Sequence, residues 1–206
     1  VTSGTDNTAV GDNAGGATTT GSSNVAVGAN ALLVSTTGDN NTAIGKDALD
    51  TNTTGSGNVA VGLDSLDANT TADDNTAIGR SSMAANTTGT ANAALGAYAL
   101  DANTTASNNT AVGYNSLGAN TTGASNIAIG KDALDTNTTG SSNVAIGMDA
   151  LDANTTADDN VAVGRSAMAA NTSGTDNVSV GAYSLDANTT GSENTAIGDN
   201  ALGANT

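Results

Sequence analysis

Hydrophobic and polar residues alternate in a short pattern that recurs with a 17-residue period along the whole chain. Each copy starts at an Asn, followed by a small or β-branched residue, Ala, an aliphatic residue and Gly, as in residues 41–45. Alternation of this kind, ended by Gly, predicts a short β-strand followed by a turn. Numbering the repeat 1–17 from its Asn, position 1 falls at twelve residues: Asn7, Asn24, Asn41, Asn58, Asn75, Asn92, Asn109, Asn126, Asn143, Asn160, Asn177 and Asn194.

Because no insertion or deletion interrupts this period, each unit is expected to form one coil of a stack. The sequence therefore predicts an all-β fold, a parallel β-solenoid (β-roll) of about twelve coils with one 17-residue repeat per coil. Stacked strands lie about 4.8 Å apart, which gives a rod roughly 58 Å long. A two-helix repeat is the main alternative, but a unit that already holds a strand and a Thr-rich turn leaves too little room for two helices.

A longer, 85-residue period lies above the first. The five units from Asn41 return as the units from Asn126. We interpret residues 1–206 as a single repeat array, with the super-repeat at 41–125 and 126–206, that grew by copying blocks of five coils.

Two columns of large apolar residues are predicted to form the core. Position 4 is aliphatic in every unit, and position 9 is Leu in nine units, Met in two and Gly in one. Each such side chain contributes roughly 1.5–3 kcal/mol when it is buried. The residues are Val10, Val27, Ile44, Val61, Ile78, Leu95, Val112, Ile129, Ile146, Val163, Val180 and Ile197 at position 4, and Gly15, Leu32, Leu49, Leu66, Met83, Leu100, Leu117, Leu134, Leu151, Met168, Leu185 and Leu202 at position 9.

Small residues beside these columns predict close approaches. Position 3 is Ala in eleven units and Ser179 in the other, so we expect a neighbour, such as a partner chain, to approach on the face opposite to position 4. The Gly at position 5 of every unit fits a turn with positive φ. The Asn at position 1 is predicted to form an internal amide ladder that links each coil to the next.

The composition allows only a thin core. The chain lacks Cys, His, Pro, Trp and Phe, so neither a disulfide framework nor a thiolate metal site is available. Ordering the residues of a coil costs ~1–2 kcal/mol per residue, which exceeds the contribution of two buried side chains. We therefore expect ladder hydrogen bonds, stacked Asn and Thr columns and lateral association to contribute to stability.

The charge of the chain opposes binding to anionic partners. Its formal net charge is −16, whereas phosphate backbones and anionic membranes attract Lys and Arg. Nucleic acid is therefore not an expected partner, and the longest apolar run, residues 29–34, is too short to insert into a membrane. The four basic residues share position 6, which predicts one outward ridge: Lys46, Arg80, Lys131 and Arg165.

The pentads at residues 41–45 (Asn-Thr-Ala-Ile-Gly) and 143–147 (Asn-Val-Ala-Ile-Gly) resemble the head repeats of YadA-like trimeric autotransporter adhesins. Similar arrays with Asn-Thr-Thr-Gly spacers also occur in phage tail-fibre-like and other bacterial surface proteins. The resemblance rests on this short pentad and extends over the whole chain. It implies a left-handed parallel β-roll in which three chains pack side by side. The unit here is longer than the typical head repeat, chiefly between positions 7 and 14.

Carboxylates are the remaining candidates for chemistry, since the chain has no imidazole and no thiol. An active site needs one particular constellation, whereas these Asp residues recur as part of the coil, so we predict no enzyme and no catalytic residue. Stacked Asp residues could bind calcium, which takes several oxygen ligands; solvated acidic turns are the alternative, and no other cofactor is expected. The residues are the pairs Asp47/Asp50, Asp64/Asp67, Asp132/Asp135 and Asp149/Asp152 and the dipeptides Asp73-Asp74 and Asp158-Asp159.

A column of N-glycosylation sequons is the sharper signal. The triplet Asn-Thr-Thr, or Asn-Thr-Ser, begins at position 12 of nine units, which places nine candidate sites in one stripe. The adjacent Thr pairs are candidates for O-linked sugars. Ordinary turn formation by Asn and Thr, with hydrogen bonds between coils, is the alternative. The candidate sites are Asn52, Asn69, Asn86, Asn103, Asn120, Asn137, Asn154, Asn171 and Asn188.

The Thr column at position 13 runs from Thr19 to Thr206, and Thr or Ser follows it at position 14. Such ladders resemble the ice-binding faces of repeat antifreeze proteins, on which regularly spaced hydroxyls and methyls order water. Ice binding through this Thr ladder is therefore the alternative function.

Taken together, these patterns favour a structural segment of a longer extracellular or surface-attached fibre, on a cell, virion or matrix. The sequence shows no polar cap at either end, so we expect coils to continue beyond both ends or to abut identical chains. The expected partners are further copies of the chain, arranged laterally, as in a trimer, or end to end. Tyr98, Tyr114 and Tyr183 are too sparse to form a sugar-stacking platform.

Overall fold

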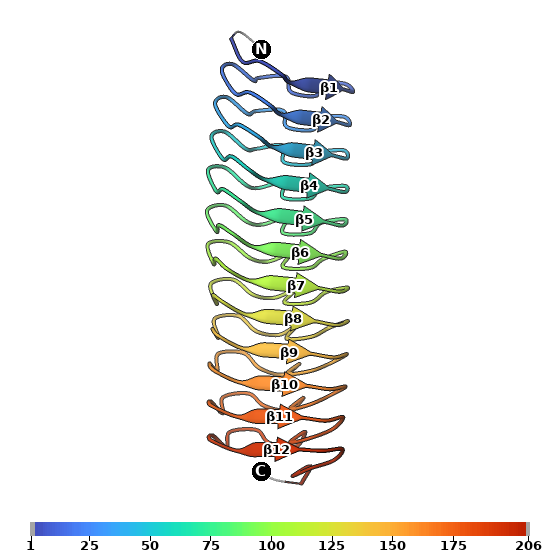
Figure 1. The fold of residues 1–206 in the computed structure, drawn as a ribbon, viewed down its shortest axis with the longest axis vertical. Coiled ribbons are helices and arrows are strands. Elements are labelled where there is room, and N and C mark those ends of the chain that lie inside the picture. Colours follow the sequence, from blue (N-terminus) through green and yellow to red (C-terminus); the bar gives the residue numbers. More distant parts are fainter. Residues whose placement is uncertain (1–2, 205–206) are drawn as a thin grey trace.

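The computed structural model describes residues 3–204 as a single stack of coils along one axis (Figure 1). It contains one parallel sheet of 12 strands in chain order, and each strand residue pairs with its equivalent in the next repeat, as Thr42 does with Val59. The predicted parallel β-solenoid with one repeat per coil is therefore confirmed. The strands are β1 Thr8–Val10, β2 Val25–Val27, β3 Thr42–Ile44, β4 Val59–Val61, β5 Thr76–Ile78, β6 Ala93–Leu95, β7 Thr110–Val112, β8 Ile127–Ile129, β9 Val144–Ile146, β10 Val161–Val163, β11 Val178–Val180 and β12 Thr195–Ile197.

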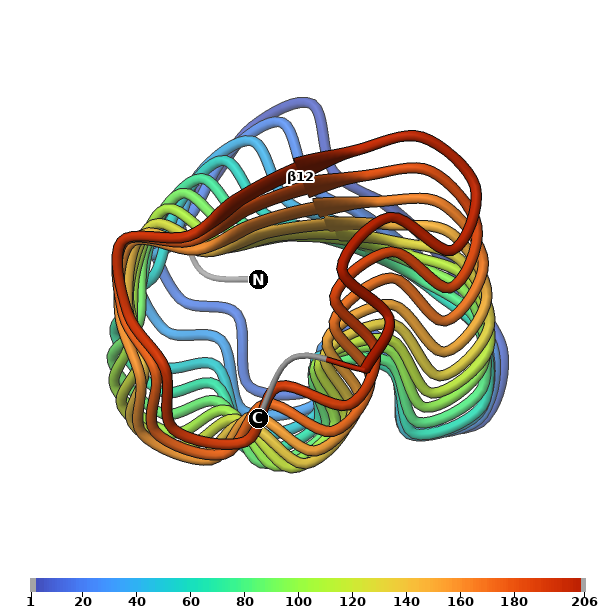
Figure 2. The same cartoon turned by 90° about the horizontal axis from the view of Figure 1, so that it is seen from below.

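Backbone hydrogen bonds link the coils well outside these three-residue strands. The Leu49 amide donates to the Ser65 carbonyl at 3.0 Å, and the Thr53 amide donates to the Thr70 carbonyl at 2.8 Å. Similar bonds recur along the rod, so most of each turn segment is tied to the coil above or below. Figure 2 shows that successive coils are rotated slightly in one sense, so the rod twists slowly along its length.

The Gly at position 5 forms the corner that follows each strand. Its φ lies between 124° and 146° in all twelve coils, which confirms the predicted positive-φ turn. Backbone also approaches closely from the next coil: a Cβ built on Gly79 would lie 2.4 Å from the carbonyl oxygen of Gly96. Both the conformation and the space therefore require glycine here.

Three further corners adopt left-handed backbone conformations that the sequence pattern does not reveal. They lie at positions 7, 9 and 17, as in Asp47 (φ 56°), Leu49 (φ 54°) and Asp74 (φ 59°). A left-handed Leu is unusual because its Cβ crowds the backbone. Here the cross-coil hydrogen bond of the Leu49 amide and the complete burial of its side chain hold the residue in place.

The core is one side chain deep, as the composition predicts. It consists of Ala from position 3, Ala or Ser from position 8, and Leu or Met from position 9; Ala43, Ala48 and Leu49 are all 0% exposed. The prediction that position 9 fills the coil is confirmed. Position 3 also points inward, so the prediction that it faces a partner chain is wrong: the close neighbours of this Ala are residues of the core.

The Asn column at position 1 forms the internal ladder that the sequence predicts. The Asn41 amide N–H donates to Oδ1 of Asn24 at 2.8 Å, and Nδ2 of Asn41 donates to the Gly55 carbonyl at 2.8 Å. Each side chain thus bonds one neighbouring coil through its oxygen and closes its own coil through its nitrogen. The interior Asn residues of this column are buried without loss of hydrogen bonds.

Candidate functional site

The outward side of the twelve strands is the most regular exposed surface of the rod. We call it the strand face and define it as the side chains at positions 2 and 4. Every one of them is exposed or half-buried, whereas the Ala between them is buried from β2 to β12, apart from the equally buried Ser179. The strand face consists of Thr8, Val25, Thr42, Val59, Thr76, Ala93, Thr110, Ile127, Val144, Val161, Val178 and Thr195 at position 2, with the aliphatic column at position 4 given above.

The prediction that position 4 belongs to the core is therefore wrong. Ile44 is 40% exposed and Leu95 is 48% exposed. Because neighbouring residues of a strand point to opposite sides, only one of positions 3 and 4 can face inward. The narrow coil already holds the large side chain of position 9, so the methyl group of Ala fits opposite it and the aliphatic residue is turned outward.

The strand face is a regular two-column array. Neighbouring residues of a column are one strand spacing apart, about 4.8 Å, and the two columns are about 6.6 Å apart along the strand. The side chains are β-branched in all strands except β6, so they are stiff. Position 4 is a continuous aliphatic column, and position 2 combines aliphatic residues with five threonines. Contiguous apolar surface of this length, bordered by polar residues, is typical of a protein interface.

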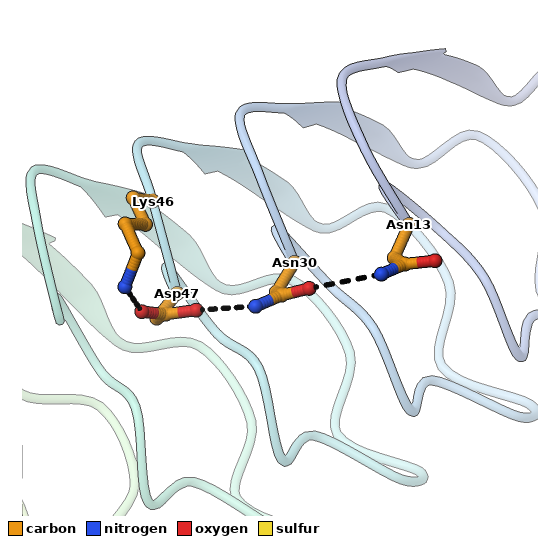
Figure 3. Close-up of polar contacts among 4 residues, drawn as sticks. All are labelled: Asn13, Asn30, Lys46 and Asp47. Atoms are coloured by element: carbon orange, nitrogen blue, oxygen red, sulfur yellow. Dashed lines mark hydrogen bonds and ion pairs between the residues drawn. The ribbon is translucent and has the colours of Figure 1, made fainter.

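Polar columns lie on both sides of the strand face. Positions 16 and 17, which precede each strand, carry Asp, Glu, Ser, Thr and Asn in most coils. Positions 6 and 7, which follow the strand, carry most of the remaining charged residues, both acidic and basic. The four basic residues at position 6 are exposed, which confirms the predicted ridge. Figure 3 shows the start of the position 7 ladder, in which Asn13 donates to Asn30 at 3.4 Å and Asn30 to Asp47 at 2.9 Å.

Each basic residue on the ridge has a partner. The Lys46 ammonium pairs with Asp47, and the same contact returns in the second super-repeat between Lys131 and Asp132. The two arginines lie over tyrosine rings, with the Arg80 guanidinium carbon 4.7 Å from the ring centre of Tyr98 and the second pair, Arg165 and Tyr183, at 4.6 Å. Tyr98 and Tyr114 also pack edge to face at 5.8 Å.

The nine sequon asparagines do not face outward. Each is 0% exposed, and they form a second internal ladder, which confirms the alternative that these residues make hydrogen bonds between coils. Nδ2 of Asn69 donates to Oδ1 of Asn52 at 3.0 Å and to the Ala72 carbonyl at 3.1 Å, so both of its hydrogens are used. The prediction that this column faces solvent is wrong. An N-linked glycan on Nδ2 would replace one of these hydrogens and has no space inside the coil. This holds for Asn52, Asn69, Asn86, Asn103, Asn120, Asn137, Asn154, Asn171 and Asn188.

The two Thr columns next to these asparagines differ in their environment. At position 13 the hydroxyl is used inside the rod, since Oγ1 of Thr53 donates to the Thr70 carbonyl at 2.9 Å and Thr36, Thr87 and Thr121 repeat this bond. At position 14 the side chains are exposed in every coil from Thr20 onward. The position 13 hydroxyls are thus engaged by carbonyls of the next coil even where the residue is exposed, as at Thr155 and Thr172, whereas position 14 is exposed throughout.

Acidic side chains at position 10 sit partly inside the turn. Burial, and then the nearby carboxylates of Asp50, Asp64 and Asp47, raises the pKa of Asp67 above its ordinary value, and burial likewise raises the pKa of Asp101. The hydrogen bond from Lys46 lowers the pKa of Asp47. Within residues 3–204 no group of three or more acidic side chains is arranged to hold a metal ion, and calcium binding stays a prediction.

No protein-family model, no curated protein and no solved structure matches this chain. In the described part of the chain, no helix is long and apolar enough to cross a membrane. The structure likewise shows no cleft or pocket among the described residues. Without a cleft, the strand face is the main candidate for a functional surface.

Proposed function

We propose that the chain is a structural segment of an extracellular or surface-attached fibre, and that copies of it associate side by side through the strand face. The exposed apolar columns along all twelve strands are the single observation that carries this proposal. Burying such a surface against a second copy removes aliphatic side chains from water at about 25 cal/mol per Å². The extracellular location is supported by the resemblance of the Asn-Thr-Ala-Ile-Gly pentads to adhesin head repeats.

The charge distribution supports association through this face rather than through the acidic sides of the rod. The strand face has no ionisable residue, whereas the chain as a whole has a formal charge of −16. Two rods that meet through the sides that carry positions 6, 7, 10, 16 and 17 would bring acidic columns together, and like charges in close contact are unfavourable. The side formed by positions 11–15 is also uncharged, but its exposed column at position 14 is Thr or Ser and offers no aliphatic surface to bury. Contact through the strand face keeps the acidic residues at the edges of the interface, where water and salt screen them.

Ice binding by the Thr ladder remains the second candidate function, with less support. It depends on free hydroxyls at positions 13 and 14, but the position 13 hydroxyls donate to carbonyls of the next coil. A measurement of thermal hysteresis in a dilute solution of the purified protein tests it: freezing at the equilibrium melting temperature would exclude it.

Arginine substitutions on the strand face test the main proposal. We expect the unmodified chain to sediment at a multiple of its 19.6 kDa mass, and the double variant Val112→Arg/Val163→Arg to sediment as a monomer, because guanidinium groups resist burial in an apolar interface. The matched control is Thr122→Arg/Ser173→Arg, which adds the same charges to exposed position 14 of the same two coils. Circular dichroism checks that each variant keeps its β-structure.

Two results would contradict the proposal. A single species of 19.6 kDa across a wide range of protein concentration and salt would show that the rods do not associate. Loss of association in the position 14 control as well as in the strand-face variant would place the contact elsewhere on the rod.

A further inference from the structure

One strand interrupts the regularity of the strand face. Position 2 is β-branched in every strand except β6, where it is Ala93, and position 4 is β-branched in every strand except β6, where it is Leu95. The smallest residue of one column and the only Leu of the other therefore lie on the same strand, near the middle of the rod in Figure 1. Ala93 is exposed and Leu95 is 48% exposed, so the depression and the protruding side chain beside it are both open to solvent.

Both of these residues differ between the two copies of the 85-residue duplication. Both also differ between β5 and β10, where Thr76 and Ile78 become Val161 and Val163, but only the β6 pair changes from one small and one long side chain to two of equal size. The copy of β6 is β11, in which Val178 and Val180 replace Ala93 and Leu95. The copy also changes the inner residues Ala94 and Ala99 to Ser179 and Ser184. Those two serines are hydrogen-bonded to each other at 2.5 Å inside the coil, so this second paired change reflects a physical contact.

No contact within a single rod explains the paired difference at residues 93 and 95. Residues i and i+2 of a strand have Cα atoms about 6.6 Å apart, and their side chains stand side by side on the same face rather than pointing at each other. A methyl group at residue 93 and a longer side chain at residue 95 need not compensate for each other within one chain. A surface that lies against both residues at once would impose this requirement.

Parallel copies related by a rotation axis along the rod provide that surface. Such a rotation brings position 2 of one copy against position 4 of its neighbour at the same height, whatever the number of copies. Leu95 of one copy then lies over Ala93 of the next, where the missing β-branch leaves room for it. In β11 the same geometry pairs valine with valine, and the layer is again filled.

Other arrangements leave this pair unmatched. A shift by one coil would place Leu95 against Thr76 or Thr110 and leave the space over Ala93 partly empty. A twofold axis perpendicular to the rod would place position 2 against position 2 and position 4 against position 4. With the axis through β6, leucine would meet leucine and alanine would meet alanine, which combines overpacking with a void. With full overlap the axis lies between β6 and β7, so Leu95 would meet Val112 and Ala93 would meet Thr110, and the small and the long side chain again lie apart.

We propose that Leu95 and Ala93 form a register lock, in which Leu95 of one copy inserts over Ala93 of a neighbouring copy and fixes the rods parallel and in register. This inference rests on the proposed lateral association and names its partner, a second copy of the same chain. It assigns to β6 a specificity that the other strands, with interchangeable Thr, Val and Ile, do not provide.

A double-mutant cycle tests the lock. Ala93→Val overfills the layer and Leu95→Val leaves a void, so each is expected to weaken association by about tenfold or more, as overpacking and cavities do in a core. The double variant Ala93→Val/Leu95→Val reproduces the natural pair of β11 and is expected to restore the dissociation constant to within about threefold of the original. Thr110→Val, a nearly isosteric change at position 2 of the neighbouring strand, is the control and should have little effect.

The orientation of the copies is read out separately. The chain has no native cysteine, so Thr37→Cys places one spin label on the exposed position 14 of the second coil, near one end of the rod, where antiparallel copies would hold the labels far apart. In-register parallel copies hold this label at one height and give one narrow distance distribution between copies. The Leu95→Val variant is expected to broaden that distribution as other registers become populated.

The outcomes separate the two proposals. If the unmodified chain is monomeric, lateral association fails and the register lock fails with it. If the unmodified chain associates, but the two single substitutions have additive effects or the labels report antiparallel copies, the lock is wrong while the proposed lateral association stands. Non-additive losses, rescue in the double variant and one narrow distance would establish the lock.

Discussion

At the scale of the single residue, the rod requires glycine, with no side chain, at the corner that follows each strand. The Gly at position 5 combines a positive φ with a carbonyl of the next coil within contact of any Cβ, so conformation and packing impose the same requirement. The left-handed residues at positions 7 and 9 are different, because side chains are present there and the surrounding hydrogen bonds maintain the conformation. Positive φ values in one coil therefore have two separate causes: the absence of a side chain at position 5, and the surrounding hydrogen bonds at positions 7 and 9.

A pair of glycine substitutions separates these requirements. Gly79→Ala is expected to lower the free energy of unfolding by ~3 kcal/mol or more, since its Cβ would lie 2.4 Å from a backbone oxygen that cannot move freely. Gly118→Ala is the matched control: it lies at position 10, where Ala84 and Ala169 occur naturally. Its Cβ would lie 2.5 Å from Oδ1 of Asn115, a side-chain atom that can move away, so we expect a change of no more than about 1 kcal/mol. Urea denaturation followed by circular dichroism measures both, and equal effects would refute this interpretation.

The residue scale also shows where the sequence was sufficient and where it was not. The period, the strand and the glycine corner follow from local chemistry, so they could be predicted. The direction of position 4 could not, because Ala43 and Ile44 alternate in either orientation and only the volume left beside Leu49 decides which one is buried. The inward turn of Asn52 was hidden for a related reason: Asn-Thr-Thr is typical of a solvated turn until the coil closes around it.

At the scale of the element, each column behaves as one long structure. The position 12 ladder illustrates this, because Nδ2 of every Asn from Asn69 to Asn188 donates to Oδ1 of the Asn in the preceding coil. The ladder ends at Asn188, whose Oδ1 is buried without a hydrogen-bond partner. The ladder begins at Asn52, whose Nδ2 donates only to the Gly55 carbonyl, since the preceding coil has Ser35 in place of Asn. Ser35 is buried and its Oγ has no hydrogen-bond partner.

Extending this ladder by one residue should therefore stabilise the rod. We expect Ser35→Asn to raise the free energy of unfolding by about 1 kcal/mol, because Oδ1 of the new side chain accepts the free hydrogen of Asn52 and removes a buried unpaired hydroxyl. Thr37→Asn, an exposed change in the same coil, is the control and should have almost no effect. The comparison is made by urea denaturation of the three proteins. A destabilised Ser35→Asn variant would show that the second coil is too narrow for the amide.

At the scale of the whole molecule, repetition also sums small electrostatic costs. The position 10 carboxylates recur through both super-repeats, and burial followed by neighbouring carboxylates raises the pKa of Asp50, Asp67, Asp135 and Asp152. The lysines at position 6 offset this little, because Lys46 and Lys131 pair with the position 7 aspartates instead. At neutral pH these partly buried carboxylates therefore lower the stability of the rod, and its four basic residues do not offset this effect.

Acidification is therefore expected to stabilise the rod. A carboxyl whose pKa is raised in the folded state binds more protons there than in the unfolded chain, so its effect on stability becomes more favourable as the pH falls from 7 toward about 4, near the unfolded value. The lowered pKa of Asp47 acts in the opposite direction, but it is outnumbered by the raised carboxyls at position 10. We expect the urea midpoint to be higher at mildly acidic pH than at pH 7, in dilute protein so that association does not contribute.

The substitution Asp67→Asn should raise the urea midpoint at pH 7 and reduce its pH dependence, because it removes the charge that burial and Asp50, Asp64 and Asp47 disfavour. A midpoint that rises with pH would show that ion pairs such as Lys46 with Asp47 outweigh the buried acidic column.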